Sequence, residues 1–156
     1  MHYLQRIFTG IIVVCVLTGF GIAAGCTAPA NPASSVPAVA GGPVDKVEIY
    51  HFHATQQCVS CIAVGDLAEK TVNENFKDEL ASGRLVFAHV NGQLLENNEL
   101  VSKYGATGSS LWIGVYDANG FHKEENVKVW YLINNKDAYS LYLTDLINKR
   151  LNGDLS

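Results

Sequence analysis

The pattern of hydrophobic and polar positions after residue 43 predicts alternating strands and helices. Residues 47–52 alternate apolar and polar side chains in a β-prone composition, as in a strand with one buried face. Residues 62–80 predict an amphipathic helix. Its apolar positions near helical spacing are Leu67, Val72, Phe76 and Leu80. The apolar run 84–90, bounded by glycine and Asn-Gly, predicts a second strand and completes a β-α-β unit.

The second half of the chain predicts two more helices and two more strands. A helix is expected over 94–104, a strand over 111–116 followed by a turn at 117–120, and a fourth strand over 127–133. Lys123-Glu124-Glu125 would then lie in a solvated loop. A final helix from about Asp137 places five residues on one face, namely Tyr139, Leu143, Leu146, Ile147 and Leu151. The order β-α-β-α-β-β-α predicts a three-layer α/β fold with a four-stranded mixed sheet.

The amino-terminal segment predicts export. Residues 7–24 carry no charge and follow a short start whose one basic residue is Arg6, which is typical of a secretion signal. The run ends in residues 22–26, Ile-Ala-Ala-Gly-Cys, which resemble the lipobox of bacterial-type lipoproteins, and this resemblance implies that Cys26 is lipidated. The alternative is an uncleaved signal anchor. Either version leaves the chain outside the cytoplasm of a prokaryote, tethered to the membrane.

Composition separates the chain into a leader, a linker and one domain. Residues 27–43 are almost entirely Ala, Pro, Ser, Gly and Val, which predicts a flexible linker, and residues 44–156 predict the folded domain. The 156-residue length suits a single core.

The net charge of −4 and the scattered basic residues exclude nucleic acid as a partner.

The candidate chemistry lies in Cys58-Val59-Ser60-Cys61. At a strand-to-helix junction, the first sulfur lies at the helix amino terminus, where free N–H groups and the helix dipole stabilise a thiolate. Cys58 is therefore the candidate nucleophile. Cys61, one turn further along the helix, is the candidate resolving thiol. These residues predict dithiol–disulfide exchange with a protein thiol or disulfide partner that is exported or membrane-associated, with the cysteine pair itself as the redox group and no other cofactor.

The domain resembles the thioredoxin superfamily from residue 47 through the cysteine motif to residues 104–108. It is most similar to small exported thioredoxin-like proteins grouped as a nitrophenyl compound nitroreductase subunit family. The resemblance places Ser110 where the superfamily has a cis-proline. It also places His51 near the superfamily's buried acid, although the segment from Phe52 to Cys58 is one residue longer. His51 and His53 share a face of the strand, and either is a candidate for tuning a cysteine pKa or passing protons.

Three other interpretations remain open from the sequence. Two thiolates and a nearby imidazole suit Cu(I) or Zn(II), so a metal carrier using Cys58, Cys61 and His53 is the main alternative. A static structural disulfide is the second, although closing so short a loop contributes little chain entropy. The third is an interaction module whose surface is aromatic. Its residues would be Trp112, Trp130, Tyr131, Tyr139 and Tyr142, for which core packing is the expected role.

Overall fold

The computed structural model describes residues 43–156. The predicted signal sequence, the lipidation of Cys26 and all but the last residue of the predicted linker lie outside the described residues. Within residues 43–156, no helix is both long enough and apolar enough to span a bilayer.

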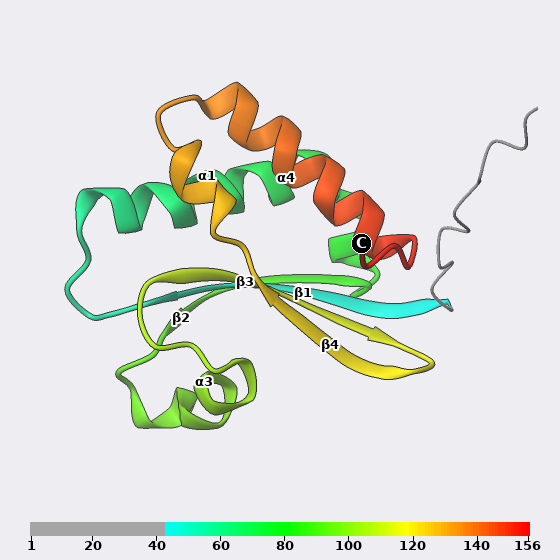
Figure 1. The fold of residues 1–156 in the computed structure, drawn as a ribbon, viewed down its shortest axis with the longest axis horizontal. Coiled ribbons are helices and arrows are strands. Elements are labelled where there is room, and N and C mark those ends of the chain that lie inside the picture. Colours follow the sequence, from blue (N-terminus) through cyan, green and yellow to red (C-terminus); the bar gives the residue numbers. More distant parts are fainter. Residues whose placement is uncertain (1–42) are drawn as a thin grey trace, which may run out of the picture. The chain divides into compact units, whose positions relative to one another are not determined.

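Four strands form one mixed sheet in the order β2-β1-β3-β4 (Figure 1). The central strand β1 (Val44–His53) pairs in parallel with β2 (Leu85–Asn91) and antiparallel with β3 (Ser110–Asp117). The outer strand β4 (Gly120–Glu125) continues from β3 as an antiparallel hairpin. The carboxyl end of β1 is therefore flanked by the end of β2 and the beginning of β3.

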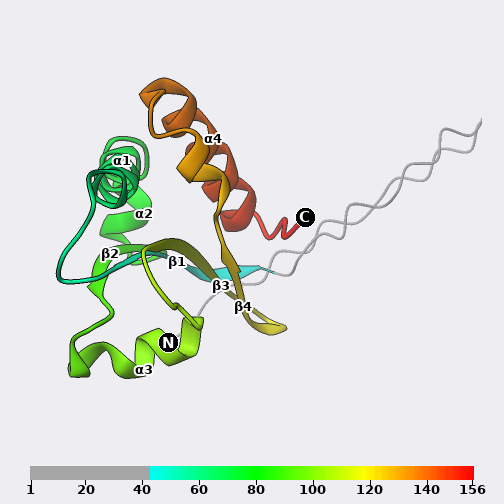
Figure 2. The ribbon, with the colours of Figure 1, turned by 60° about the vertical axis from the view of Figure 1, so that its left-hand side comes forward.

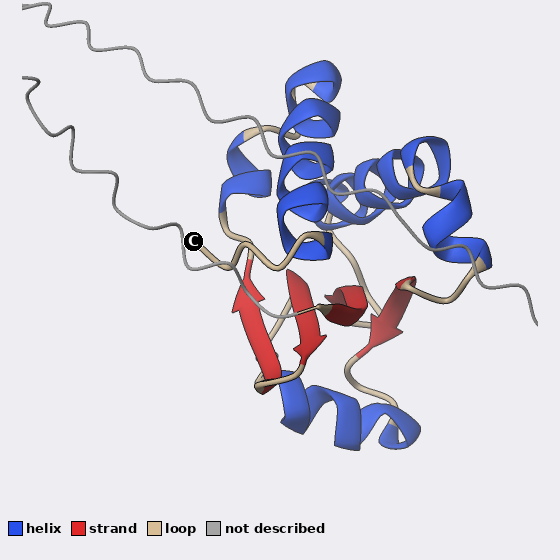
Figure 3. Ribbon diagram, turned by 90° about the vertical axis from the view of Figure 1, so that its right-hand side faces the viewer, coloured by secondary structure: helices blue, strands red, loops and turns tan. Residues whose placement is uncertain are grey.

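Helices cover both faces of the sheet. Helices α1 (Val59–Asn75) and α4 (Lys136–Leu151) pack together on one face, and α3 (Asn98–Tyr104) lies on the other (Figure 2). Figure 3 shows the strands between these two helical layers. A short 3₁₀ turn, η1 (Leu95–Asn97), leads into α3. This is the three-layer arrangement that the alternating sequence pattern predicts.

Each face of the sheet has its own apolar core. The larger core, between the sheet and α1 and α4, includes Ile49, Val72 and Leu143. The smaller core, under α3, contains Phe52, Val90 and Tyr104. Tyr139 of α4 is fully buried in the larger core, whereas Tyr131 is 83% exposed. Three more of the candidate aromatic residues are half-buried, namely Trp112, Trp130 and Tyr142.

The single helix predicted over residues 62–80 is wrong in its bounds. Helix α1 begins at Val59, directly after Cys58, and ends at Asn75, and a separate short helix, α2, spans Lys77–Ala81. Phe76 breaks the helix because its backbone leaves the helical region while its side chain is buried in the larger core. The apolar spacing continues across the break, which is why periodicity alone does not reveal it.

The fourth strand predicted over residues 127–133 is also wrong. The strand is β4 at Gly120–Glu125, and Lys128–Tyr131 form a 3₁₀ turn, η2. Gly120 adopts a positive φ of 123° and lets the chain reverse directly after β3, so β4 takes the place beside it. Val129 is buried under the turn instead of in the sheet. Val129 and its neighbours Trp130, Leu132 and Ile133 therefore pack on the larger core from a connecting turn, whereas Val127 and Tyr131 are exposed.

The segment Lys123-Glu124-Glu125 is part of β4, which corrects its assignment to a solvated loop. Glu124 forms a two-point ion pair with Arg150 of α4: Nε–Oε1 is 2.5 Å and Nη2–Oε2 is 3.0 Å. Arg150 is 5% exposed. The β4 edge of the sheet is thereby joined to the last helix.

Candidate functional site

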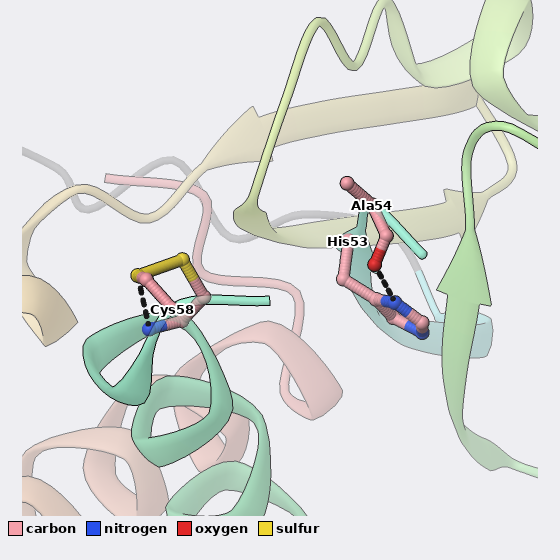
Figure 4. Close-up of a disulfide and its surroundings, with 4 residues drawn as sticks. His53, Ala54 and Cys58 are labelled. Carbon is pink, nitrogen blue, oxygen red and sulfur yellow. Dashed lines mark hydrogen bonds between the residues drawn. A yellow bond between two sulfur atoms is a disulfide. The ribbon is translucent and has the colours of Figure 1, made fainter. Parts of the chain in front are cut away.

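Cys58 and Cys61 form a disulfide at the amino terminus of α1 (Figure 4). Cys58 is the residue before the first helical turn, its backbone is extended, and its Sγ accepts a hydrogen bond from the Cys61 backbone N–H at 3.1 Å. The cysteine side chain therefore occupies the place where a serine or aspartate usually caps a helix.

The surroundings of the two sulfurs differ. Cys58 is exposed and Cys61 is half-buried. Val59 between them is 85% exposed. The first turn of α1 carries no acidic side chain, so nothing there opposes the positive end of the helix dipole. Cys58 is thus the sulfur at the positive end of the helix dipole, and Cys61 is the less accessible of the two.

A buried imidazole lies beside the backbone of Cys61. His51 of β1 is 1% exposed and packs against α1 at Gly65, where an added Cβ would come within 2.3 Å of the His51 Nδ1. Burial lowers the pKa of His51 to about 4, helped by neighbouring His89 and His53, while the Cys61 backbone opposes the shift. His51 is therefore neutral at physiological pH, and its ring lies between the first turns of α1 and the sheet.

His89 and Glu69 belong to the same cluster, and sequence reasoning missed both. His89 is the register partner of His51 across the β1–β2 pair, and their Nδ1 atoms are 3.0 Å apart. On its outer side, the His89 Nε2 lies 3.4 Å from Oε2 of Glu69 on α1. The sequence signal that could have revealed the pair is that His51 and His89 stand at corresponding positions of two strands expected to be adjacent and parallel.

His53 is not brought to the cysteines. Its Nδ1 is 3.0 Å from the Ala54 carbonyl oxygen, and Figure 4 shows its ring well apart from the disulfide. Its ring stacks on that of His51 at a centroid distance of 5.5 Å. Among residues 43–156, no group of three or more His, Cys, Asp and Glu side chains is arranged to hold a metal ion.

Ser110 begins β3 opposite Phe52 of β1 and is 4% exposed. Its hydroxyl donates to the Gly108 carbonyl at 3.0 Å and accepts from the Trp112 indole N–H at 3.0 Å. These two bonds fix the loop that enters β3. The hydroxyl thus has a local structural role at the start of β3.

A mixed four-stranded sheet of this order, with a Cys-x-x-Cys disulfide at the start of the helix after its central strand, defines a thioredoxin-like domain. No family model matches the sequence, and no curated protein matches it. Among solved structures, the Trx4 domain of ERdj5 is similar with 16% identity over 69% of this chain and 81% of that chain, at a TM-score of 0.46. A thioredoxin from Thermus thermophilus is similar with 16% identity, over 67% of this chain and 75% of its own, at a TM-score of 0.42.

Proposed function

We propose that this protein is a thiol–disulfide oxidoreductase that works outside the cytoplasm, tethered to a membrane, and exchanges its Cys58–Cys61 disulfide with a partner protein. The observation that carries the proposal is the disulfide itself, which lies at the amino terminus of α1 with Cys58 exposed and with an acid–base side chain buried beside the Cys61 backbone. A purely structural disulfide needs neither the exposure nor the histidine.

The exchange proceeds through a mixed disulfide. A partner thiolate attacks the Cys58 sulfur, the Cys58–Cys61 bond breaks, and Cys61 departs with the electron pair and takes up a proton. The partner's second thiolate then attacks the partner sulfur of the mixed disulfide and releases Cys58. Two electrons pass from the partner dithiol to the protein. In the reverse direction, Cys58 attacks a partner disulfide and Cys61 loses its proton to resolve the mixed species.

The geometry supports this division of labour between the cysteines. Cys58 is exposed and its sulfur accepts the Cys61 N–H, so it suits attack on a partner. Cys61 is half-buried, and His51 interacts with the Cys61 backbone, so an imidazole is close to the residue whose thiol must gain and lose a proton. We assign His51 to that proton transfer and give His53 no direct part.

The tether and the narrower kinship also belong to this proposal. The uncharged leader and the lipobox-like end at Cys26 support a membrane-anchored lipoprotein, with an exported or membrane-associated protein as the partner. The resemblance to the nitrophenyl compound nitroreductase subunit group supports membership of that group. Neither argument depends on the geometry of the disulfide.

The first test is the trapping of a partner. Cys61→Ser in the full-length chain should accumulate a mixed disulfide on Cys58, because the thiol that resolves it is gone. Cys58→Ser should trap far less, because Cys61 is the more buried sulfur. Non-reducing gels of both variants, with the double variant as control, measure the difference. Equal trapping by the two single variants would contradict the assignment of nucleophile and resolving thiol.

The second arm is the reduction potential of the pair, measured with and without a chelator. An oxidoreductase shows a defined potential that chelation does not change. A Cu(I) or Zn(II) carrier using Cys58, Cys61 and His53 would resist oxidation until the metal is removed. The latter result would replace the proposed function by metal transport.

A further inference from the structure

His51, His89 and Glu69 form a line of side chains from beside the Cys61 backbone to the surface. We propose that the two imidazoles are a proton relay between Cys61 and solvent, and that Glu69 holds its outer end. The proposal rests on the proposed function, since it concerns the proton that Cys61 gains and loses during exchange. Its new element is the route: His89 and Glu69 are positioning and transfer groups outside the cysteine motif.

The distances and the exposure follow the order that a relay requires. The two Nδ1 atoms are 3.0 Å apart, so one imidazole donates its proton to the other. The next step, from His89 Nε2 to Glu69 Oε2, is 3.4 Å. The His51 residue is 1% exposed, whereas the side chains of His89 and Glu69 are 34% and 50% exposed. A proton that Cys61 passes to His51 cannot leave directly to water, because His51 is buried. The partly exposed His89 provides the route to solvent.

The transfer balances without a charged intermediate. When Cys61 loses its proton, one nitrogen of His51 accepts it and the Nδ1 of His51 passes its own proton to the Nδ1 of His89. His89 then releases a proton from Nε2 to water, with Glu69 as the acceptor beside it. Both rings end as neutral tautomers with the proton on the other nitrogen. Protonation of Cys61 during disulfide reduction runs along the same atoms in reverse.

The packing keeps His51 neutral and in place. The groups facing it are His53 on its own strand, His89 on β2, and the Cys61 backbone and Gly65 on α1. None of these is an acid that would fix a proton on the ring. The His51 Nε2 is buried and has no hydrogen-bond partner among the described residues. A buried nitrogen without a partner is costly in a purely structural histidine, and a relay gives it a use.

Gly65 leaves the space on α1 in which the His51 and His89 rings pack. A glycine inside a helix costs about 1 kcal/mol relative to alanine. Here an alanine Cβ would lie 2.3 Å from His51 and 2.9 Å from the Cε1 of His89. The absent side chain lets both rings pack against α1, one helical turn after Cys61.

The test separates the two thiols by their reaction with dithiobis-nitrobenzoate. In the reduced full-length chain, Cys58 attacks the reagent and releases one thionitrobenzoate, and Cys61 then resolves the mixed disulfide and releases the second. The second phase requires Cys61 to lose its proton. His89→Gln keeps a hydrogen-bonding side chain but cannot relay a proton, so we expect it to slow the second phase on the order of tenfold and leave the first unchanged.

Three further variants complete the test. His89→Ala should be slow in the second phase and be restored by added imidazole, because the vacated position is exposed to solvent. His122→Gln is the matched control: His122 also contacts a carboxylate, with Nε2 3.1 Å from Asp117 Oδ1, and its side chain is similarly exposed. It should change neither phase. Glu69→Gln should slow the second phase less than His89→Gln does.

The outcomes distinguish the relay from the proposed function. An unchanged second phase in His89→Gln would overturn the relay while leaving the exchange function standing. If the second phase is slow in His89→Ala and added imidazole does not restore it, His89 has a structural role, and this result would also overturn the relay. A wild-type chain that releases a single thionitrobenzoate would contradict the proposed function itself, because Cys61 would then resolve nothing.

Discussion

At the scale of single residues, the main feature is a histidine held neutral inside the protein. Burial lowers the pKa of His51 from 6.5 to about 4, and the neighbouring His89 and His53 act in the same direction. Between these pH values the unfolded chain binds a proton at His51 and the folded chain does not. Stability therefore falls as the pH is lowered from about 6.5 to about 4, and this histidine alone contributes about 3 kcal/mol to the fall.

We predict that His51→Gln loses this part of the pH dependence. Urea denaturation of the oxidised full-length chain near neutral pH and near pH 4 measures the fall in the free energy of unfolding, which should be smaller by about 3 kcal/mol in the variant. The carboxylates contribute equally to both proteins and cancel in the comparison. His122→Gln serves as the control. An equal fall in wild type and His51→Gln would show that the folded chain protonates His51 as readily as the unfolded chain.

At the scale of elements, the ion pair between β4 and α4 holds the outer edge of the sheet. Arg150 is buried, contacts both oxygens of Glu124, and also donates to the Asp154 carbonyl at 2.6 Å. It therefore links the edge strand, the last helix and the carboxyl-terminal residues. The sequence placed Glu124 in a loop because a run of three charged residues is usually solvated, whereas pairing with β3 turns one of them toward α4.

We predict that Glu124→Gln destabilises the domain by about 2–4 kcal/mol, because it leaves a buried guanidinium without its counter-charge. Glu125→Gln is the matched control, since the next residue is exposed and points away from this pair. Urea denaturation compares the two variants with wild type. Equal stabilities for the two variants would show that the Arg150 contacts to the carboxyl-terminal backbone suffice.

At the scale of the whole molecule, the proposed division is a membrane-attached amino terminus and a redox domain in residues 44–156. The chemistry of the domain does not depend on how the chain is attached. A lipid on Cys26 and an uncleaved apolar helix would both keep the disulfide in the oxidising space outside the cytoplasm, where we propose that the exchange partner lies.

We predict that the full-length chain, produced in a bacterial host, incorporates labelled palmitate and that Cys26→Ser does not. Lipidation requires the thiol at that position, whereas an uncleaved helix does not. Cys15→Ser is the control, because it removes the other leader cysteine. Membrane association of an unlabelled wild-type chain would contradict lipidation and favour the signal anchor.

The sequence determined those features that depend on local periodicity and spacing. Alternation over residues 47–52, the apolar faces of the helices and the Cys-x-x-Cys spacing at a strand-to-helix junction are readable because each is set by neighbours a few residues apart. They predict the element order, the thioredoxin-like fold and the disulfide pair. The edge strand after β3 was predicted wrongly, because its mostly polar residues 120–125 carry a weaker strand pattern than the apolar run 127–133.

The tertiary structure decided everything that depends on register and close approach between distant residues. Residues 120–125, and not 127–133, pair with β3, because the tight turn at Gly120 reverses the chain directly after β3. His51 contacts His89, which is 38 residues away in the sequence, because the β1–β2 register places the two opposite each other. Both rings fit against α1 because Gly65 has no side chain. His53, equally suitable in sequence, faces Ala54 instead. Such choices follow from packing across the sheet, which no local pattern records.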